Sequence, residues 1–195
     1  MERYQELVPK RVNLRQVDTP YIEDNSTVET DEPRGELQPI AARVLMKVLY
    51  AARMCRFDLL RPCCFLATKI TKWDRSCDRA LRRLICYINS TLDVKMQAWI
   101  GNPPSEWEFV VYSDADFASD KTTSRSTSGV FVCVRASHTF FPLTAISKRQ
   151  TCVSHSTPEA EIVAADHAVR TAGLPGLKTV GGPPSAQAAA LLQRR

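Results

Sequence analysis

The stretch Trp107–Ala118, WEFVVYSDADFA, decides the fold of this chain together with Ser154–Ala168, SHSTPEAEIVAADHA. The first stretch contains a short apolar run, FVVY, whose residues favour β structure, and it predicts a strand. Asp114 and Asp116 follow where that strand is expected to end. We therefore expect a carboxylate at the rim of a sheet.

The second stretch carries the signals of a helix start. Ser156 with Glu159 fits a capping box, and Thr157 followed by Pro158 fits an N-cap with proline at the first helical position. The start of the helix is therefore predicted, with either Ser156 or Thr157 as the cap.

Helical geometry separates the two glutamates of this stretch. At about 100° per residue, Glu159 falls on one line with Asp166 and Arg170, as a solvated stripe should. Glu161 points the other way, on the side of four alanines: Ala164, Ala165, Ala168 and Ala172. A buried carboxylate needs protonation, a hydrogen-bonding partner or a metal ion. Three explanations remain open for Glu161: it binds a metal or takes part in catalysis, it is a structural acid with hydrogen-bonding partners, or it lies in a frayed first turn.

Four motifs follow one another over about 50 residues, and together they are far more specific than any one alone. They are Tyr112–Ala118 (YSDADFA), Arg125–Gly129 (RSTSG), Ile146–Gln150 (ISKRQ) and Ser156–Glu161 (STPEAE). In order and spacing they resemble the ribonuclease H domain of copia-type retrotransposon Pol polyproteins. The chain departs from that family at Phe117, where tryptophan is usual, and at Pro158 and Ile162, where a polar residue and a tyrosine are more typical.

The resemblance implies hydrolysis of the RNA strand of an RNA/DNA hybrid by two divalent ions. It assigns the catalytic carboxylates to Asp114 and Glu161, and a metal site formed by these two with Asp116. Hard oxygen ligands suit Mg²⁺ or Mn²⁺. The family also expects a later strand that ends in an aspartate, but the only acidic residue after Glu161 is Asp166, on the solvated stripe. We therefore expect a C-terminally truncated ribonuclease H that binds metal weakly and has little or no nuclease activity.

The resemblance extends upstream to Leu37–Leu60 and Arg79–Thr91, which look like the segment that links the reverse transcriptase of the same polyprotein to its ribonuclease H. No polymerase motif lies in residues 1–40, so polymerase activity is not expected. Apolar periodicity independently predicts three helices here, around residues 40–49, after Pro62, and over residues 77–88.

Charge is distributed unevenly along the chain. Residues 1–40 hold 5 basic and 9 acidic side chains, residues 41–92 hold 11 and 3, and residues 93–195 hold 10 and 9. The basic middle segment could follow a phosphate backbone without sequence preference, although a solvated basic helix face explains it as well. The candidate contacts to nucleic acid are Arg79, Arg82, Arg83, Arg125, Lys148 and Arg149.

These patterns predict an α/β (α+β) chain in four parts. Residues 1–36 form a disordered or irregular leader, and residues 173–195 a linker with a short helical end. Between them, the resemblance implies a helical connection segment at 37–92 and a partial ribonuclease H-like domain at 93–172. The partial domain should contain an incomplete mixed sheet with one packed helix. Its strands are expected at residues 94–100, 107–113, 129–134 and 139–146, and its helix at residues 158–172.

Other features of the sequence exclude several classes of protein. No signal peptide or membrane span is apparent, and the seven cysteines include no Cys-x-x-Cys pair, so we expect reduced thiols in the cytoplasm or nucleus rather than disulfides or zinc. The three histidines have no ligand spacing, and no Gly-x-Ser-x-Gly or phosphate-binding loop is present. The resemblance implies an RNA/DNA hybrid or other nucleic acid and the rest of a Pol polyprotein as partners, with no membrane. The alternative function is a remnant that binds nucleic acid without catalysis or that functions only in a larger assembly.

Overall fold

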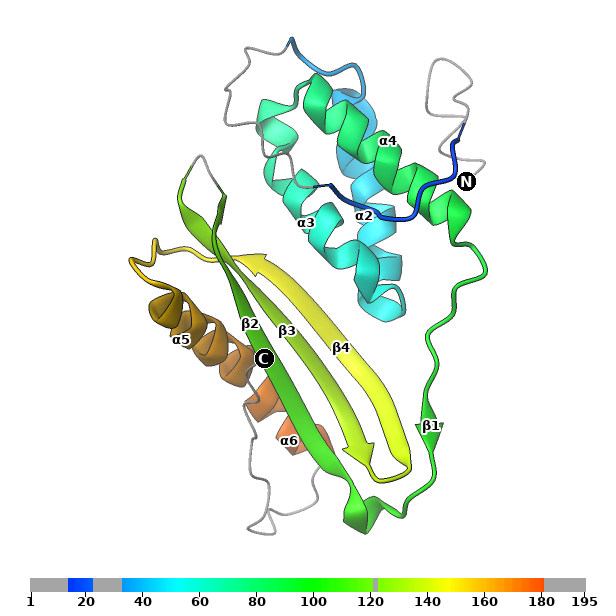
Figure 1. Ribbon diagram of the computed structural model, residues 1–195, viewed down its shortest axis with the longest axis vertical. Helices are drawn as coiled ribbons and strands as arrows, with labels where there is room; N and C mark the ends of the chain where they lie inside the picture. Colours follow the sequence, from blue (N-terminus) through cyan, green and yellow to red (C-terminus); the bar gives the residue numbers. More distant parts are fainter. Residues whose placement is uncertain (1–13, 23–32, 121–122, 181–195) are drawn as a thin grey trace. The chain divides into compact units, whose positions relative to one another are not determined.

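The computed structural model describes residues 14–22, 33–120 and 123–180 (Figure 1). The chain divides into two compact units, Met1–Met96 and Gln97–Arg195. The first is helical and the second contains the only sheet among the described residues. None of the helices in these ranges is long and apolar enough to cross a membrane.

The helical unit contains the three expected helices. They are α2 (Gln38–Met54), α3 (Leu60–Thr68) and α4 (Arg75–Ser90), with short 3₁₀ turns at Phe57–Leu59 and Ile70–Lys72. Each helix buries one apolar face, as its period of 3.6 residues predicts. The common core is formed by Ala41, Val44, Leu45, Val48, Ala52, Leu59, Leu60, Cys63, Leu66, Cys77, Leu81, Leu84 and Ile85.

Aspartates on or before α4 cap two of these helices. Asp74 is the N-cap of α4 and accepts a hydrogen bond from the Cys77 amide at 2.8 Å. Asp78, in the first turn of α4, accepts from the amides of Glu36 at 2.7 Å and Leu37 at 3.1 Å. Because Leu37 has no capping side chain of its own, a residue about 40 positions away supplies the cap of α2.

The second unit is built on an antiparallel sheet of order β1-β4-β3-β2 (Figure 1). Its strands are β1 (Trp99–Ile100), β2 (Glu108–Asp120), β3 (Arg125–Ala136) and β4 (Thr139–Arg149). In the described sheet β2 pairs with β3 alone, so the strand that carries Asp114 lies at an edge.

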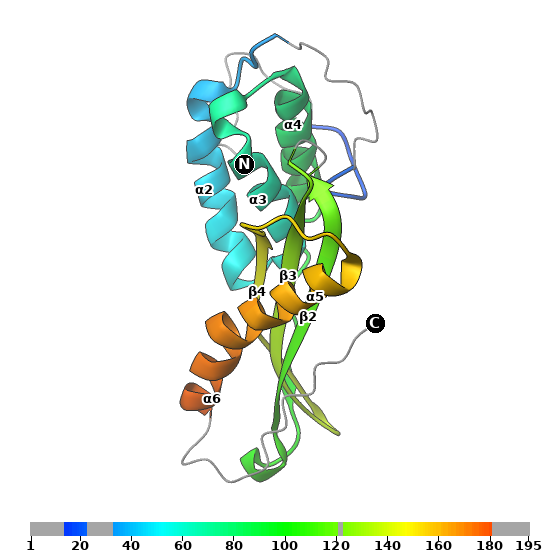
Figure 2. The same cartoon turned by 90° about the vertical axis from the view of Figure 1, so that its left-hand side faces the viewer.

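One helix packs across a face of this sheet, as Figure 2 shows. It is α5 (Thr157–Ala168), which continues as a π-helical turn, Val169–Gly173, and then as α6 (Leu174–Val180). The small side chains of α5 allow its backbone to approach the strands closely. Two apolar clusters form there: Val111, Val130 and Val132 with Ala168 and Ala172, and Ala115 with Ala160 and Ala164.

The structure corrects three predictions about this unit. The described sheet is antiparallel throughout, not mixed, because its three long strands follow one another through short connections. The strand expected at residues 94–100 is reduced to Trp99–Ile100, since residues 94–98 have no strand partner. The linker expected from Gly173 is wrong for Leu174–Val180, which is helical; the rest of that segment, with its expected helical end, lies outside the described residues, as does most of the leader.

Candidate functional site

Asp114 lies on the exposed edge strand β2, on the face of the sheet that α5 does not cover. Side chains alternate along a strand, and Ala115 points to α5, where it contacts Ala160 and Ala164. Asp114 therefore leaves the strand on the opposite side, together with Asp116 two residues further on. Both aspartates are exposed.

Glu161 lies in the first turns of α5, beside the buried row of Ala160, Ala164 and Ala168. Its side chain is half-buried, which agrees with the prediction that it belongs to the packed side of the helix. Ser156 proves to be the N-cap, with its Oγ accepting from the Glu159 amide at 3.3 Å. The frayed-turn explanation for Glu161 thus loses its basis.

Asp114 and Glu161 both lie near the edge strand β2, but they are on opposite faces of the sheet. Each is the sequence neighbour of a residue in the contact between Ala115 and Ala160. Their side chains begin on opposite faces, so they can approach each other only around the free edge of β2. Among the described residues, no group of three or more His, Cys, Asp and Glu side chains could hold a metal ion.

A buried polar network, missed by the sequence reasoning, positions α5 on the sheet. The Nε2 of Gln150 donates to Ser128 Oγ at 3.0 Å and to the Ala160 carbonyl at 2.9 Å, and the Gln150 amide donates to the Ser126 carbonyl at 2.8 Å. Ser126, Ser128 and Gln150 are each at most 5% exposed. Two of the four motifs, RSTSG and ISKRQ, therefore contain residues that join β3 and β4 to the helix that bears Glu161. The sequence does contain a signal for this network, because Ser126, Ser128 and Gln150 are polar residues in or next to strands that are otherwise apolar, and buried polar groups need hydrogen-bond partners.

Lys148 and His167 face each other across the contact between the sheet and α5. Ser128, which pairs with Lys148 in the β3–β4 ladder, points to α5, and cross-strand partners share a face. Burial, and then the charge of Lys148, lower the pKa of His167, so that its imidazole is neutral near pH 7. The Nε2 atom of His167 is buried without a hydrogen-bond partner among the described residues. Lys148 remains exposed but is directed to the helix rather than to the open face.

The other two predicted cations of the sheet are placed around Asp120. Arg149 forms an ion pair with Asp120, Nη1 to Oδ2 at 2.8 Å, and Arg125 is the cross-strand partner of the same aspartate. Asp120 is 12% exposed and thus partly shielded from solvent. The ion pair therefore ties Arg149, the last residue of β4, to the end of β2, and this makes Arg149 a weaker candidate for a phosphate contact.

The predicted cations of the helical unit separate into two groups. Arg79 and Arg82 are exposed and, with Arg75, recur at i, i+4 and i+7 of α4, on the side opposite the buried Leu81 and Leu84. Arg83 lies outside this row: its Nη2 donates to Thr19 Oγ1 at 2.7 Å. Arg83 therefore holds the segment before α2 against α4, and the structure does not support it as a phosphate contact.

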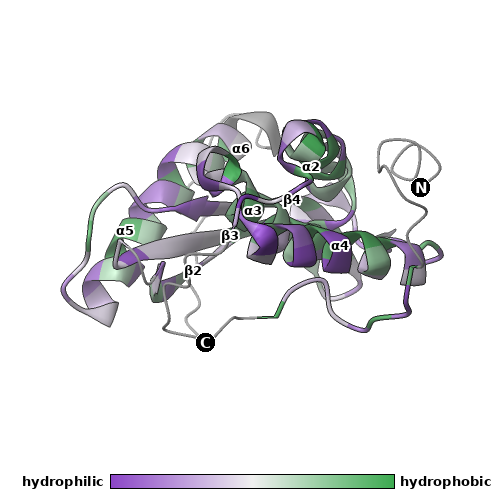
Figure 3. Cartoon of the chain, turned by 90° about the horizontal axis from the view of Figure 1, so that it is seen from above, coloured by the Kyte–Doolittle hydropathy of each residue, from purple (hydrophilic) through white to green (hydrophobic). Residues whose placement is uncertain are grey.

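All three acids of residues 41–92 are engaged within the helical unit. Asp74 and Asp78 cap helices, and Asp58 forms an ion pair with Arg56 at 2.8 Å. Arg56 in turn donates to the carbonyl and hydroxyl of Thr91 at the end of α4. Arg75, Arg79 and Arg82 form one row on the outer side of α4, and this row is called the cationic ridge below. Figure 3 shows hydrophilic colour along much of α4.

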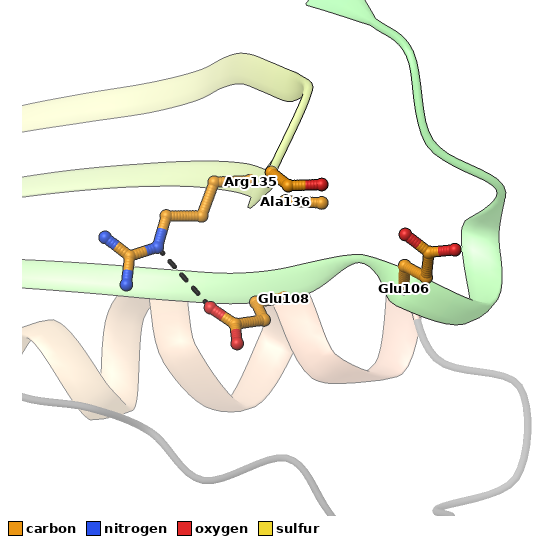
Figure 4. Close-up of a pocket in the computed structure, with 5 residues that line it drawn as sticks. Glu106, Glu108, Arg135 and Ala136 are labelled. Carbon is orange, nitrogen blue, oxygen red and sulfur yellow. Dashed lines mark hydrogen bonds and ion pairs between the residues drawn. The ribbon is translucent and has the colours of Figure 1, made fainter.

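A shallow pocket of about 390 Å³ lies at the other end of the sheet, lined by Glu106, Glu108, Arg135, Ala136 and Ser137 (Figure 4). Arg135 and Glu108 form an ion pair across it at 3.4 Å. Asp114 is six residues further along β2, so the pocket and the predicted carboxylate site are separate.

Comparison of the chain with protein-family models, with curated proteins and with solved structures finds no match.

Proposed function

We propose that this chain belongs to the connection and ribonuclease H region of a copia-type retrotransposon Pol polyprotein, and that it binds an RNA/DNA hybrid in the cytoplasm or nucleus without cleaving it efficiently. The four ordered motifs support the origin. The cationic ridge supports the binding, and the separation of Asp114 and Glu161 by the sheet argues against efficient cleavage.

The observation that carries the binding is the excess of basic over acidic side chains in residues 41–92. The segment has 11 basic and 3 acidic side chains, and all three acids are hydrogen-bonded or ion-paired inside the unit. The ridge on α4 spans about 10 Å at 1.5 Å per residue. Phosphates follow one another at about 3.4 Å of axis along one nucleic-acid strand, so the ridge can accompany several of them. Such contacts recognise the backbone rather than the bases.

Salt-dependent binding of a fluorescently labelled RNA/DNA hybrid tests this proposal. Changing Arg75, Arg79 and Arg82 to Gln should weaken binding of the hybrid. It should also reduce the steepness of the plot of the logarithm of the association constant against the logarithm of the salt concentration by about 2 to 3, because each lost phosphate contact contributes a little under one. The matched control removes three charges from α2 instead, by changing Arg43, Lys47 and Arg53 to Gln. An equal loss in both variants would mean that net charge, and not the ridge, provides the binding.

A cleavage assay on the same hybrid in Mg²⁺ or Mn²⁺ tests the catalytic part. We expect no cleavage above the level of Glu161→Gln. Clear activity in the unmodified chain that Glu161→Gln abolishes would establish the chain as an active ribonuclease H and overturn this part of the proposal.

A further inference from the structure

The outer side of α2 carries an exposed apolar row that nothing in the described chain covers. Its members are Met46, Tyr50 and Met54, with 50%, 72% and 60% of their surface exposed. At about 100° per residue they lie on the side opposite the buried row that runs from Ala41 to Ala52. The helix therefore has two apolar faces, one of which is used in the core.

Three cations accompany this outer row. Arg43, Lys47 and Arg53 are exposed and lie within one turn of Met46, Tyr50 or Met54. The row and its cations together form the outer α2 face. It differs in chemistry from the ridge on α4, which has arginines but no apolar side chains between them.

The spacing of the apolar row identifies the geometry of its partner. Residues at i, i+4 and i+8 form the kind of ridge that packs into the groove of another helix, most often at a crossing angle near −50°. Methionine adapts well to such contacts, and a tyrosine contributes apolar area together with a hydroxyl. The flanking cations select acidic side chains on either side of the partner's groove.

Other occupants fit this face less well. A second copy of the same face would bring two sets of three cations together, which costs free energy. A row one residue wide gives little apolar area for insertion into lipid, because the broad apolar face of α2 is already buried in the core. A phosphate backbone offers no apolar groove for the two methionines.

We infer that the outer α2 face is a docking site for an acidic amphipathic helix of another protein. This inference is independent of the nucleic-acid binding proposed for α4, since the two faces share no residue.

Fluorescence anisotropy with a labelled synthetic helix tests the inference. The probe is about 20 residues long, because shorter isolated helices are marginal in water, with alanine and leucine on one face and glutamate on its flanks. Changing Met46, Tyr50 and Met54 to Ser should weaken its binding about tenfold or more while the thermal unfolding of the full chain stays unchanged, since all three side chains are exposed. The α4 variant with Arg75, Arg79 and Arg82 changed to Gln should retain the binding, and a probe with lysine in place of glutamate should not bind.

Three results would overturn the inference. The first is equal binding of the probe by the serine variant and the unmodified chain. The second is loss of hybrid binding in the serine variant, which would assign the face to nucleic acid. The third is binding to vesicles of anionic phospholipid that depends on the same three residues. Failure of the probe to bind while the hybrid still binds through α4 would reject this inference and leave the proposed function standing.

Discussion

At the scale of single residues, Gly35 occupies a crowded position of the helical unit that has no room for a side chain. Gly35 lies where Asp78 caps α2 and where the Asp78 carboxylate also accepts from Trp73 Nε1 at 2.7 Å. A Cβ at residue 35 would be 2.4 Å from the Asp74 carbonyl oxygen and 2.6 Å from Cδ1 of Trp73. Backbone on one side and a buried ring on the other leave no room for a methyl group.

Gly35→Ala should therefore destabilise the helical unit, by about 1–3 kcal/mol, as overpacking usually does. The fluorescence of Trp73 during urea unfolding measures the change, in a background where Trp99 and Trp107 are phenylalanine. Gly129→Ala is the matched control, because its added Cβ would find its nearest neighbour, the Asp114 carbonyl oxygen, at 3.8 Å. Equal stability of the two variants would contradict the crowding argument.

At the scale of elements, the register of α5 on the sheet depends on the polar network around Gln150. Its side-chain amide reaches both β3 and the first turn of α5, and both partners are buried. Local capping by Ser156 explains where the helix begins, whereas Gln150 explains where on the sheet it lies. The position of Glu161 depends on both.

Gln150→Leu keeps the volume of the side chain but leaves the Ala160 carbonyl and Ser128 Oγ without this donor. We expect a loss of about 1–3 kcal/mol in the stability of the second unit. Hydrogen exchange of the α5 amides, or urea unfolding, provides the measurement. Ser154→Ala removes only the longer hydrogen bond to Gln150 Oε1, at 3.4 Å, and should cost less. A larger loss in the serine variant would show that Gln150 is not the main tie.

The contact between the end of α2 and the end of α4 predicts a dependence on pH. Burial alone would raise the pKa of Asp58, but hydrogen bonds from Arg56 and Tyr87 outweigh it and lower the pKa below 3.8. A carboxyl group with a lowered pKa stabilises the fold above its unfolded value, and this contribution is lost as the pH falls through the folded value. The helical unit should therefore lose stability below about pH 4.

Asp58→Asn tests this assignment by urea unfolding between about pH 3 and 6. The variant should be less stable than the unmodified chain at pH 6, and the difference should shrink toward pH 3. A difference that stays constant over this range would mean that the ionised form of Asp58 is not what stabilises the contact.

At the scale of the whole molecule, the packing of both units separates the cysteines by reactivity. Cys55 and Cys152 are exposed, whereas Cys63, Cys77, Cys86 and Cys133 are buried and Cys64 is intermediate. Burial, and then the neighbouring Cys64, raise the pKa of Cys63 to about 12. A thiol in that state forms almost no thiolate at neutral pH and reacts slowly.

Alkylation of the native chain with iodoacetamide at pH 7.5 should therefore modify Cys55 and Cys152 first, as mass spectrometry of the digested protein can show. The remaining cysteines should react at the rate of unfolding or local opening. Rapid modification of Cys63 or Cys133 would contradict the packing of the unit that contains it. Full reaction in urea provides the control.

The sequence by itself determined most of the local structure. An apolar period of 3.6 residues predicted the helices α2 and α4, and a β-favouring apolar run predicted the strand β2, because both patterns depend only on neighbouring residues. The capping box predicted the start of α5 and left only the choice between Ser156 and Thr157 open. These predictions depend on residues that are close together in the chain. The same is true of the prediction that Glu161, and not Glu159, lies on the packed side of the helix.

Only the tertiary structure decided how these elements meet. Alternation along β2 places Asp114 and Ala115 on opposite faces, but which face receives α5 depends on packing between distant segments. The same holds for Asp78, which caps a helix about 40 residues away, and for Gln150, which joins a strand to a helix. Spacing in the sequence does not reveal such partners, because each contact depends on how separate elements pack against each other.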